Sequence, residues 1–246
     1  MSGHSKWANI KRRKAKVDAA KGNIFSRLTK DIMSAARQGG PNPETNFRLR
    51  LAIARAKENN LPQANIERAI QRATGQVEGV SYEEAIYEGF GPGGAAVLLE
   101  ILTDNRNRTA GEIRHLFTRH GGSLGESGSV AWMFDQKGRL EVPRDRGFDE
   151  ERLLEAALEA GAEDLRVEEG TFEILTDPTQ LDEVHRALLA RGVPVERAER
   201  VWLPRMTVEL SGPEAERMLK LLDLLDDHDD VQRVFTNAEF LDEALA

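Results

Sequence analysis

The sequence predicts a multidomain α+β protein, in which an N-terminal helical bundle is followed by two α+β domains. Residues 1–75 carry apolar residues at helical spacing, whereas strand and helix patterns alternate after residue 81. From 138 to 203 the expected order is βαββαβ, which is typical of a ferredoxin-like domain. Shorter α+β pieces flank this unit. Either the ferredoxin-like domain is inserted in a domain formed by both pieces, or two consecutive domains are followed by a C-terminal tail.

The distribution of charge divides the chain. Residues 1–75 hold 16 Lys and Arg against 5 Asp and Glu, a net of +11, and the remaining 171 residues hold 18 against 37, a net of −19. Such asymmetry indicates a segment that binds nucleic acid or another anionic surface, attached to an acidic body. The alternative is a solvated basic face without a partner.

The segment 4–21 is expected to be a basic arm. Like charges at helical spacing, such as Arg12 and Lys16, oppose an independent helix by roughly 0.2–0.5 kcal/mol a pair, so we expect the arm to become ordered on its partner. Its cations can neutralise phosphates and release counterions. The expected nucleic-acid-binding residues are Lys6, Trp7, Lys11, Arg12, Arg13, Lys14, Lys16 and Lys21. Trp7 either stacks on an exposed base or anchors the arm to the helical domain.

Three amphipathic helices complete the N-terminal domain. The first covers 23–38 and ends at Gly39 and Gly40, which suit a left-handed cap. The second is expected to begin with Asn42 as cap and Pro43 at its first position and to end near 60, and the third covers 62–75. The expected inward residues are Ile24, Leu28, Ile32 and Ala35, then Phe47, Leu51 and Ala54, then Ile66, Ala69 and Ile70.

The elements expected after residue 80 follow from strand and helix patterns. The flanking pieces comprise strands 81–90, 95–103 and 129–134 with a helix at 108–122, and strands 206–210 and 231–235 with a helix at 213–225. The ferredoxin-like unit comprises strand 138–142, helix 148–161, a strand pair within 164–177 around Gly170, helix 178–192 and strand 193–203. The expected domain bounds are 1–80 (helical), 81–134 with 206–246 (discontinuous α+β) and 135–205 (inserted).

Several classes of site are not expected. The chain has no cysteine, which excludes thiolate chemistry and disulfides, and its five histidines show no metal-ligand spacing. Gly89 to Gly94 match G-x-G-x-x-G, but a strand pattern follows, so a glycine-rich hairpin is favoured over a dinucleotide site. We therefore expect no catalytic residues, cofactor, metal or small-molecule substrate. No apolar run suits a membrane span or a secretory signal, so we expect a cytoplasmic protein.

The segment 102–115 crowds polar groups between a strand and a helix. Arg106, Asn107 and Arg108 are expected to contact a partner or RNA, with the arginines gripping phosphate or carboxylate. The alternative is that the segment is an elaborate N-cap, in which an Asn or Asp such as Asp104, Asn105 or Asn107 holds amides of the helix.

Six motifs occur in order along nearly the whole chain: GHSKWANIKRRKAK, AARQGGPNPETNFRLRLAIARAK, NLPQANIERAI, YEGFGPGGAA, LTDNRNRT and GGSLGESGSVAWMF. With them the chain closely resembles the YebC/PmpR family, which includes the mitochondrial translational activator of cytochrome c oxidase. The resemblance implies three domains with the ferredoxin-like one inserted, and no enzymatic activity. Many relatives carry proline where Phe47 stands, and this departure bears on where the second of the three packed helices begins.

Family members are described as DNA-binding transcriptional regulators and as translation factors at the ribosome, including on proline-rich stalls. Our first hypothesis is a non-enzymatic cytoplasmic DNA-binding regulator of transcription, whose acidic body binds a protein partner or tunes specificity. The alternative is a ribosome-associated translation factor whose arm binds ribosomal RNA. In that case the loops near 91–94, 104–109 and 121–129 are expected to approach a functional centre of the ribosome.

Overall fold

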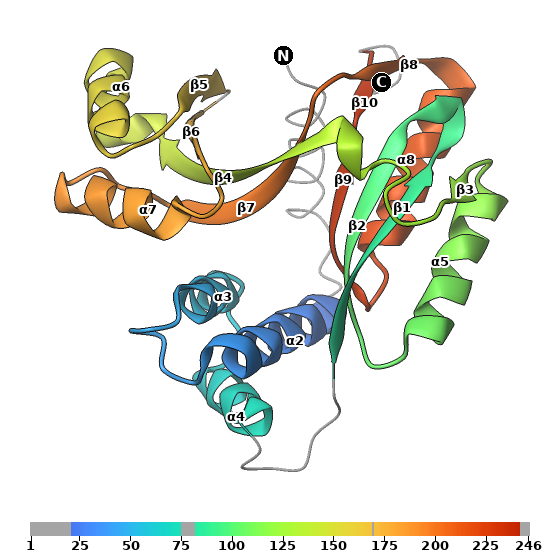
Figure 1. Cartoon of the computed structure of the whole chain (residues 1–246), viewed down its shortest axis with the longest axis horizontal. Coiled ribbons are helices and arrows are strands. Elements are labelled where there is room, and N and C mark those ends of the chain that lie inside the picture. The colour runs from blue at the N-terminus through green and yellow to red at the C-terminus, as the bar shows by residue number, and fades with distance from the viewer. Residues whose placement is uncertain (1–20, 75–81, 169, 242–246) are drawn as a thin grey trace. The chain divides into compact units, whose positions relative to one another are not determined.

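The computed structural model describes residues 21–74, 82–168 and 170–241 (Figure 1). The chain forms two compact units. Unit 1 combines Met1–Met133 with Pro204–Ala246, and unit 2 is Phe134–Leu203. Each unit is described by itself below.

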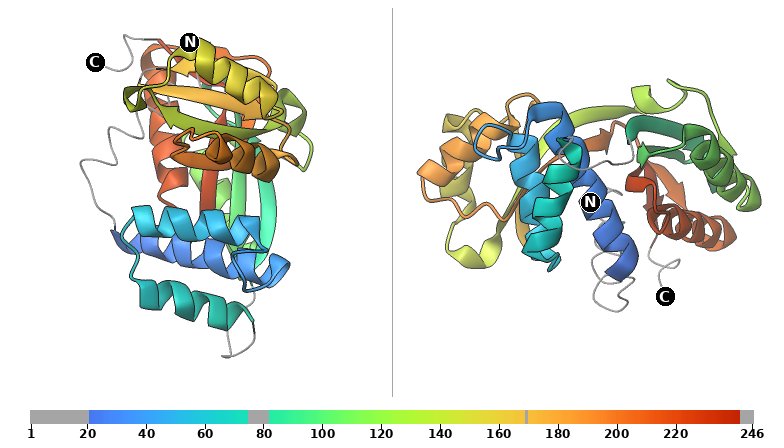
Figure 2. Two further views of the ribbon diagram at one scale, coloured as in Figure 1. Left: turned by 90° about the vertical axis from the view of Figure 1, so that its left-hand side faces the viewer. Right: turned by 90° about the horizontal axis from the view of Figure 1, so that it is seen from below.

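Unit 1 begins with three packed helices, α2 (Lys21–Gly39), α3 (Phe47–Glu58) and α4 (Gln63–Ala73). In two views α2 lies between the other two helices (Figures 1 and 2). Their shared core contains Leu28, Ile32, Ala35, Leu49, Ala52, Ala56, Ile66 and Ala69, among others. The expected cap of the first of these helices is confirmed, because Gly40 has φ 88° and its N–H donates to the Ala36 carbonyl at 2.9 Å.

The predicted start of α3 was wrong. Asn42 opens a turn, and its carbonyl accepts the N–H of Asn46 at 3.0 Å, while Asn46 itself caps the helix by accepting the N–H of Leu49 at 3.0 Å. The Asn46 amide also donates to the carbonyls of Ala35 and Gly40, each at 2.8 Å. These tertiary contacts favour the later cap. They also rotate the buried face, which is Leu49, Ala52 and Ala56 rather than Phe47, Leu51 and Ala54.

The rest of unit 1 is an α+β sheet built from both flanking pieces of the chain. Its elements are β1 (Glu83–Phe90), β2 (Ala96–Thr103), α5 (Arg106–Arg119), β3 (Ser123–Leu124), β8 (Val208–Leu210), α8 (Gly212–Asp226), β9 (Val231–Thr236) and β10 (Ala238–Phe240). The main sheet has the order β3-β1-β2-β9, and β8 and β10 form a parallel pair. Because β9 pairs antiparallel with β2, the C-terminal piece completes a sheet that the N-terminal piece begins. Helices α5 and α8 pack on one face of this sheet through a common core that includes Leu99, Ile113, Phe117 and Leu221.

The glycine-rich segment after β1 is a hairpin turn, as expected. A 3-10 turn, η1 (Pro92–Gly94), joins β1 to β2, and Gly93 and Gly94 have φ values of 68° and 75°. These conformations favour glycine. No α-helix begins there to present its amides to a pyrophosphate.

The strand expected at 129–134 was wrong. The segment Ala131–Met133 is a 3-10 turn, η2, and the next strand, β4 (Phe134–Pro143), begins only at its end. The reason is Glu88, whose buried carboxylate accepts the N–H groups of Val130 and Ala131 at 2.8 and 2.7 Å. Those amides are therefore taken away from strand pairing. The short strands β3 and β10 had no counterpart in the prediction.

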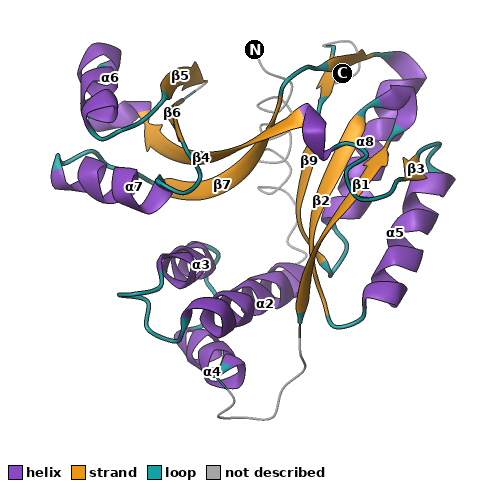
Figure 3. Ribbon diagram, viewed as in Figure 1, coloured by secondary structure: helices purple, strands orange, loops and turns teal. Residues whose placement is uncertain are grey.

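Unit 2 has the ferredoxin-like arrangement. After β4 and η3 (Arg144–Arg146) come α6 (Glu150–Glu159), β5 (Asp164–Glu168), β6 (Thr171–Thr176), α7 (Leu181–Ala190) and β7 (Arg197–Pro204). The sheet order is β5-β6-β4-β7, and Gly170 turns the β5–β6 hairpin with φ 84° (Figure 3). The predicted fold class is confirmed. The division of unit 1 into a helical domain and a separate α+β domain stays a prediction.

The sheet of unit 2 contains a buried ionic cluster. The Arg139 guanidinium lies 2.6 Å from Glu199, 3.0 Å from Glu173 and 3.5 Å from Glu141, and no side chain of the four is more than 11% exposed. Burial raises the pKa of Glu173 even though Arg139 opposes the shift. Since three carboxylates face one guanidinium, the cluster depends on Arg139.

Among the residues that the structure describes, no helix is long and apolar enough to cross a membrane.

Candidate nucleic-acid interface

The segment that contains α2 to α4 has a net positive charge. Residues 21–74 hold ten Lys and Arg against four Asp and Glu, a net of +6. Arg68 and Arg72 are exposed and lie one turn apart on α4, and within the described ranges neither forms an ion pair. They are therefore available to phosphates.

Most of the predicted arm lies outside the described residues. Lys21 is the first residue of α2, so this helix continues directly from the arm. The other predicted contacts, which are Lys6, Trp7, Lys11, Arg12, Arg13, Lys14 and Lys16, fall within 1–20. Their role in binding stays a prediction.

Asp230 connects α2 to the segment 102–109. Its carboxylate lies 2.7 Å from the Lys30 ammonium and 2.6 Å from the Arg108 guanidinium, and it accepts the Thr109 hydroxyl at 2.8 Å. Burial by itself would raise the pKa of Asp230, but the hydrogen bonds from Lys30, Arg108 and Thr109 outweigh it and lower the pKa to about 2. Asp230 is thus ionised and holds two elements of unit 1 together.

The segment 102–109 is largely used for local structure. Asn105 caps α5 by accepting the N–H of Arg108 at 3.1 Å, so the N-cap interpretation is confirmed for this residue. Arg108 also lies 2.9 Å from Asp104. Arg106 and Asn107 are the remaining candidates, since both are exposed and the Arg106 side chain is 58% exposed, with Glu83 as a partner only at 4.0 Å. A contact of Arg106, Asn107 or Arg108 with RNA or a partner stays a prediction.

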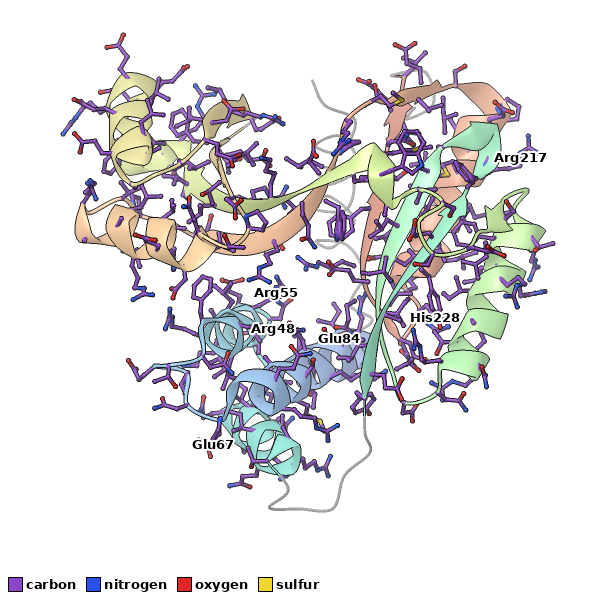
Figure 4. The ribbon with its side chains drawn as sticks, in the orientation of Figure 1. Arg48, Arg55, Glu67, Glu84, Arg217 and His228 are labelled. Atoms are coloured by element: carbon purple, nitrogen blue, oxygen red, sulfur yellow. The ribbon has the colours of Figure 1, made fainter. Side chains whose placement is uncertain are left out.

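A second ionic contact fixes α2 and α3 to the start of β1. Arg48 pairs with Glu84, which also accepts the Ser34 hydroxyl, and Figure 4 shows Arg48 and Glu84 on these neighbouring elements. Burial by itself would raise the pKa of Glu84, but the hydrogen bonds from Arg48 and Ser34 outweigh this effect, so the pKa is lowered. Arg27 also donates to the carbonyl of Asp226, the last residue of α8, at 2.5 Å, so α2 contacts α8 as well as the start of β1.

The three loops that are expected to approach a functional centre of the ribosome lie at two ends of the sheet. Glu83 pairs with Thr103 at one end of the β1–β2 hairpin and Phe90 pairs with Ala96 at the other, where Ser123 also pairs. The hairpin turn 91–94 and the loop 121–129 therefore lie together. The segment 104–109 lies at the opposite end of an eight-residue strand, roughly 23 Å away. Hairpin pairing fixes this separation, and the approach of these loops to a functional centre stays a prediction.

The structure also assembles a cluster of metal-ligand types that sequence spacing did not reveal. Glu112, His228 and Asp230 place ligand atoms within 4.8 Å of one another. They line a polar cavity of about 450 Å³ together with Lys30, Tyr82, Asp104, Arg108, Asp227 and Asp229. His228 stands in the turn between α8 and β9, beside α5 in Figure 4, and its Nε2 lies 2.9 Å from Glu112. Because Lys30 and Arg108 already occupy both oxygens of Asp230, these cations neutralise the carboxylate that a metal would need.

Comparisons with known proteins cover the whole length. The family model described as "TACO1/YebC protein N-terminal domain" matches residues 5–76, and "TACO1/YebC second and third domain" matches residues 82–238. A "probable transcriptional regulatory protein" of Pelotomaculum thermopropionicum is 58% identical over 243 residues, which cover 98% of this chain and 100% of that protein. One of Carboxydothermus hydrogenoformans is 54% identical over 244 residues, with 98% and 100% covered.

A solved structure is similar as well. The crystal structure of a conserved hypothetical protein, Aq1575 from Aquifex aeolicus, has a TM-score of 0.84 and 50% identity, and the match covers 94% of this chain and 96% of that one. Together with the two family models, these similarities show that the chain belongs to the TACO1/YebC family.

Proposed function

We propose that this protein is a non-enzymatic cytoplasmic regulator that binds DNA through its basic arm and helices α2 to α4 and thereby regulates transcription. The observation that carries the proposal is the division of charge, +11 over residues 1–75 against −19 over the rest. Relatives named as probable transcriptional regulatory proteins support it. An acidic body does not attract polyanions by itself, so the basic segment supplies the attraction.

The contacts within unit 1 support a defined mechanical role for α2. This helix continues from the arm and is fixed to the sheet through Lys30 and Asp230, which lie 2.7 Å apart. Phosphate contacts by the arm would therefore anchor unit 1 on the nucleic acid. Arg68 and Arg72 on α4 would add phosphate contacts, and the acidic surface would stay available to a protein partner.

A second candidate function is that of a ribosome-associated translation factor that binds ribosomal RNA. The observation in its favour is Trp132, a residue of unit 1 that is 58% exposed. An exposed indole can stack on an unpaired base, and RNA loops and bulges offer such bases. Both candidates use the same cations, because both targets are polyanions.

Crosslinking in cells separates the two candidates. The full chain is crosslinked to nucleic acid, and the recovered fragments are sequenced. Recovery of promoter DNA is expected for the transcriptional regulator. Exclusive recovery of ribosomal RNA would contradict it in favour of the second candidate. A chain with Lys11, Arg12, Arg13 and Lys14 changed to Glu is the control, and it should recover neither.

A further inference from the structure

Two exposed apolar side chains lie on adjoining segments of unit 1. Trp132 on η2 is 58% exposed, and Met206, just after β7, is 59% exposed. The two segments run side by side, because the N–H of Arg205 donates to the carbonyl of Met133 at 2.9 Å. Trp132 and Met206 each stand next to one residue of this backbone contact, on adjoining segments of unit 1.

The indole of Trp132 has its polar atom turned to its own loop. Its Nε1–H donates to the Ser129 carbonyl at 3.1 Å. A tryptophan N–H normally seeks a hydrogen-bond partner, and here the loop supplies it. What remains for a ligand is apolar ring surface, which favours stacking over hydrogen bonding.

The loop that carries Trp132 is held in place by Glu88. This side chain is buried, and its two oxygens accept the N–H groups of Gly128, Val130 and Ala131 at 2.7, 2.8 and 2.7 Å. The Glu88 carbonyl also accepts the N–H of Gly125 at 2.8 Å. Because these contacts fix the loop beforehand, a ligand that meets Trp132 loses little affinity to ordering it.

The size of the surface decides between two kinds of partner. Two side chains that are rather more than half exposed offer on the order of 300 Å² of apolar area, whereas a stable protein interface takes about 800 Å² from each partner. One base stacked on one aromatic ring needs no more than this surface provides. We propose that Trp132, with Met206 beside it, is a stacking site for a single unpaired nucleobase.

This inference rests on the proposed binding of nucleic acid and adds to it a preference for unpaired strands. The loop that carries Trp132 is held at Glu88, and the contact of α2 with Glu84 lies four residues earlier on β1, roughly 13 Å away along the strand. Phosphate contacts at the arm and a stacked base at Trp132 would therefore involve separate parts of one strand. A base paired within a duplex cannot stack on Trp132 without leaving its helix.

The test compares Trp132→Ala with the unchanged full chain. Binding is measured by fluorescence anisotropy with two probes, a 20-nucleotide single-stranded oligoadenylate RNA and a 20-base-pair duplex DNA. We expect Trp132→Ala to weaken binding of the single strand by about 5- to 150-fold and to leave duplex binding within twofold. Trp132→Phe keeps an aromatic ring and should restore most of the loss. Leu158→Ala, at a side chain 55% exposed on α6, is the matched control and should change neither affinity.

Three outcomes separate the two proposals. Unchanged single-strand affinity in Trp132→Ala would overturn the stacking site and leave its surface to a protein partner. Equal losses on both probes would also overturn it, because a stacking site discriminates unpaired from paired bases. If the unchanged chain binds neither probe, the proposed function fails together with the inference. Circular dichroism of each variant verifies that the chain is folded.

Discussion

The Lys30 ammonium lies 2.7 Å from the Asp230 carboxylate, and these side chains are only 10% and 5% exposed. Lys30 also donates to the Asp229 carbonyl at 3.1 Å and lies 5.5 Å from the centre of the Tyr82 ring. A helix that follows the basic arm is thus joined to the edge of an acidic sheet through a buried ion pair. Removing one member of such a pair costs more than the pair itself contributes, because the other charge stays buried.

Asp230→Ala should lower the free energy of unfolding by about 3 kcal/mol, because Lys30 is left without its carboxylate partner and Arg108 loses its closest one. Urea unfolding followed by circular dichroism measures the change. Asp229→Ala is the matched control, since its exposed side chain should contribute no more than about 0.5 kcal/mol. Equal effects of the two substitutions would show that the buried pair has no special role.

Acid should weaken this contact over a defined pH range. The pKa of Asp230 is about 2 in the folded chain against an ordinary value of 3.8, so the unfolded chain takes up the proton first as pH falls. The stabilisation is fully present above about pH 5 and is lost between about pH 5 and pH 2, with a total of about 2 kcal/mol. Unfolding free energies measured across this range should therefore fall less steeply in Asp230→Asn than in the unchanged chain. Parallel curves would contradict the assignment.

Glu88→Gln should loosen the loop that carries Trp132. A neutral amide has one accepting oxygen in place of two, so the amides of Gly128, Val130 and Ala131 cannot all keep their partners. Leaving a buried donor unpaired costs about 1–3 kcal/mol, so hydrogen exchange at these amides should accelerate by roughly tenfold or more. Glu126→Gln in the same loop is the control, since its side chain is exposed. Unchanged protection in Glu88→Gln would remove Glu88 from this role.

Arg139→Leu should destabilise unit 2 by more than about 3 kcal/mol at neutral pH, because Glu141, Glu173 and Glu199 would remain buried without a cation. This loss of stability should become smaller as pH falls, because protonation of the three glutamates removes the charges that repel one another. Arg166→Leu, at an exposed arginine on β5 that pairs with Asp164 two residues away, is the control for charge. Thermal unfolding at pH 7 and pH 5 compares the two variants. A deficit in Arg139→Leu that does not depend on pH would contradict the ionic explanation.

Periodicity predicted the elements that obey local rules. The helix ending at Gly39 and Gly40, the hairpin around Gly93 and the βαββαβ order of unit 2 all follow from apolar spacing and turn residues, and the structure confirms them. The flanking pattern left open whether the C-terminal piece joins the first, and the family resemblance favoured one discontinuous domain; that β9 pairs with β2 was not predicted.

Prediction from local sequence failed where a side chain from elsewhere in the chain forms the hydrogen bonds of the backbone. Asn46 replaced Asn42 as the cap of α3 because its amide reaches two carbonyls outside that helix. The expected strand at 129–134 became a turn because Glu88, more than forty residues earlier, takes its amides. Asp230 lies 200 residues after Lys30 and 122 after Arg108, and only the fold brings these cations to it. Spacing along the chain contains no signal for such contacts.

The central claim is that the basic arm supplies the attraction for nucleic acid. It is tested most directly by the salt dependence of binding to duplex DNA, with Lys11, Arg12, Arg13 and Lys14 changed together to Glu. Each lost phosphate contact should remove about 0.9 from the slope of log affinity against log salt, so four should flatten it by about 3 to 4. The control changes four exposed arginines of unit 2 to Glu, which are Arg152, Arg186, Arg191 and Arg197. It alters the net charge by the same amount and should leave the slope unchanged. A flattened slope in the arm variant alone is the predicted result, and an unchanged slope there would contradict the claim.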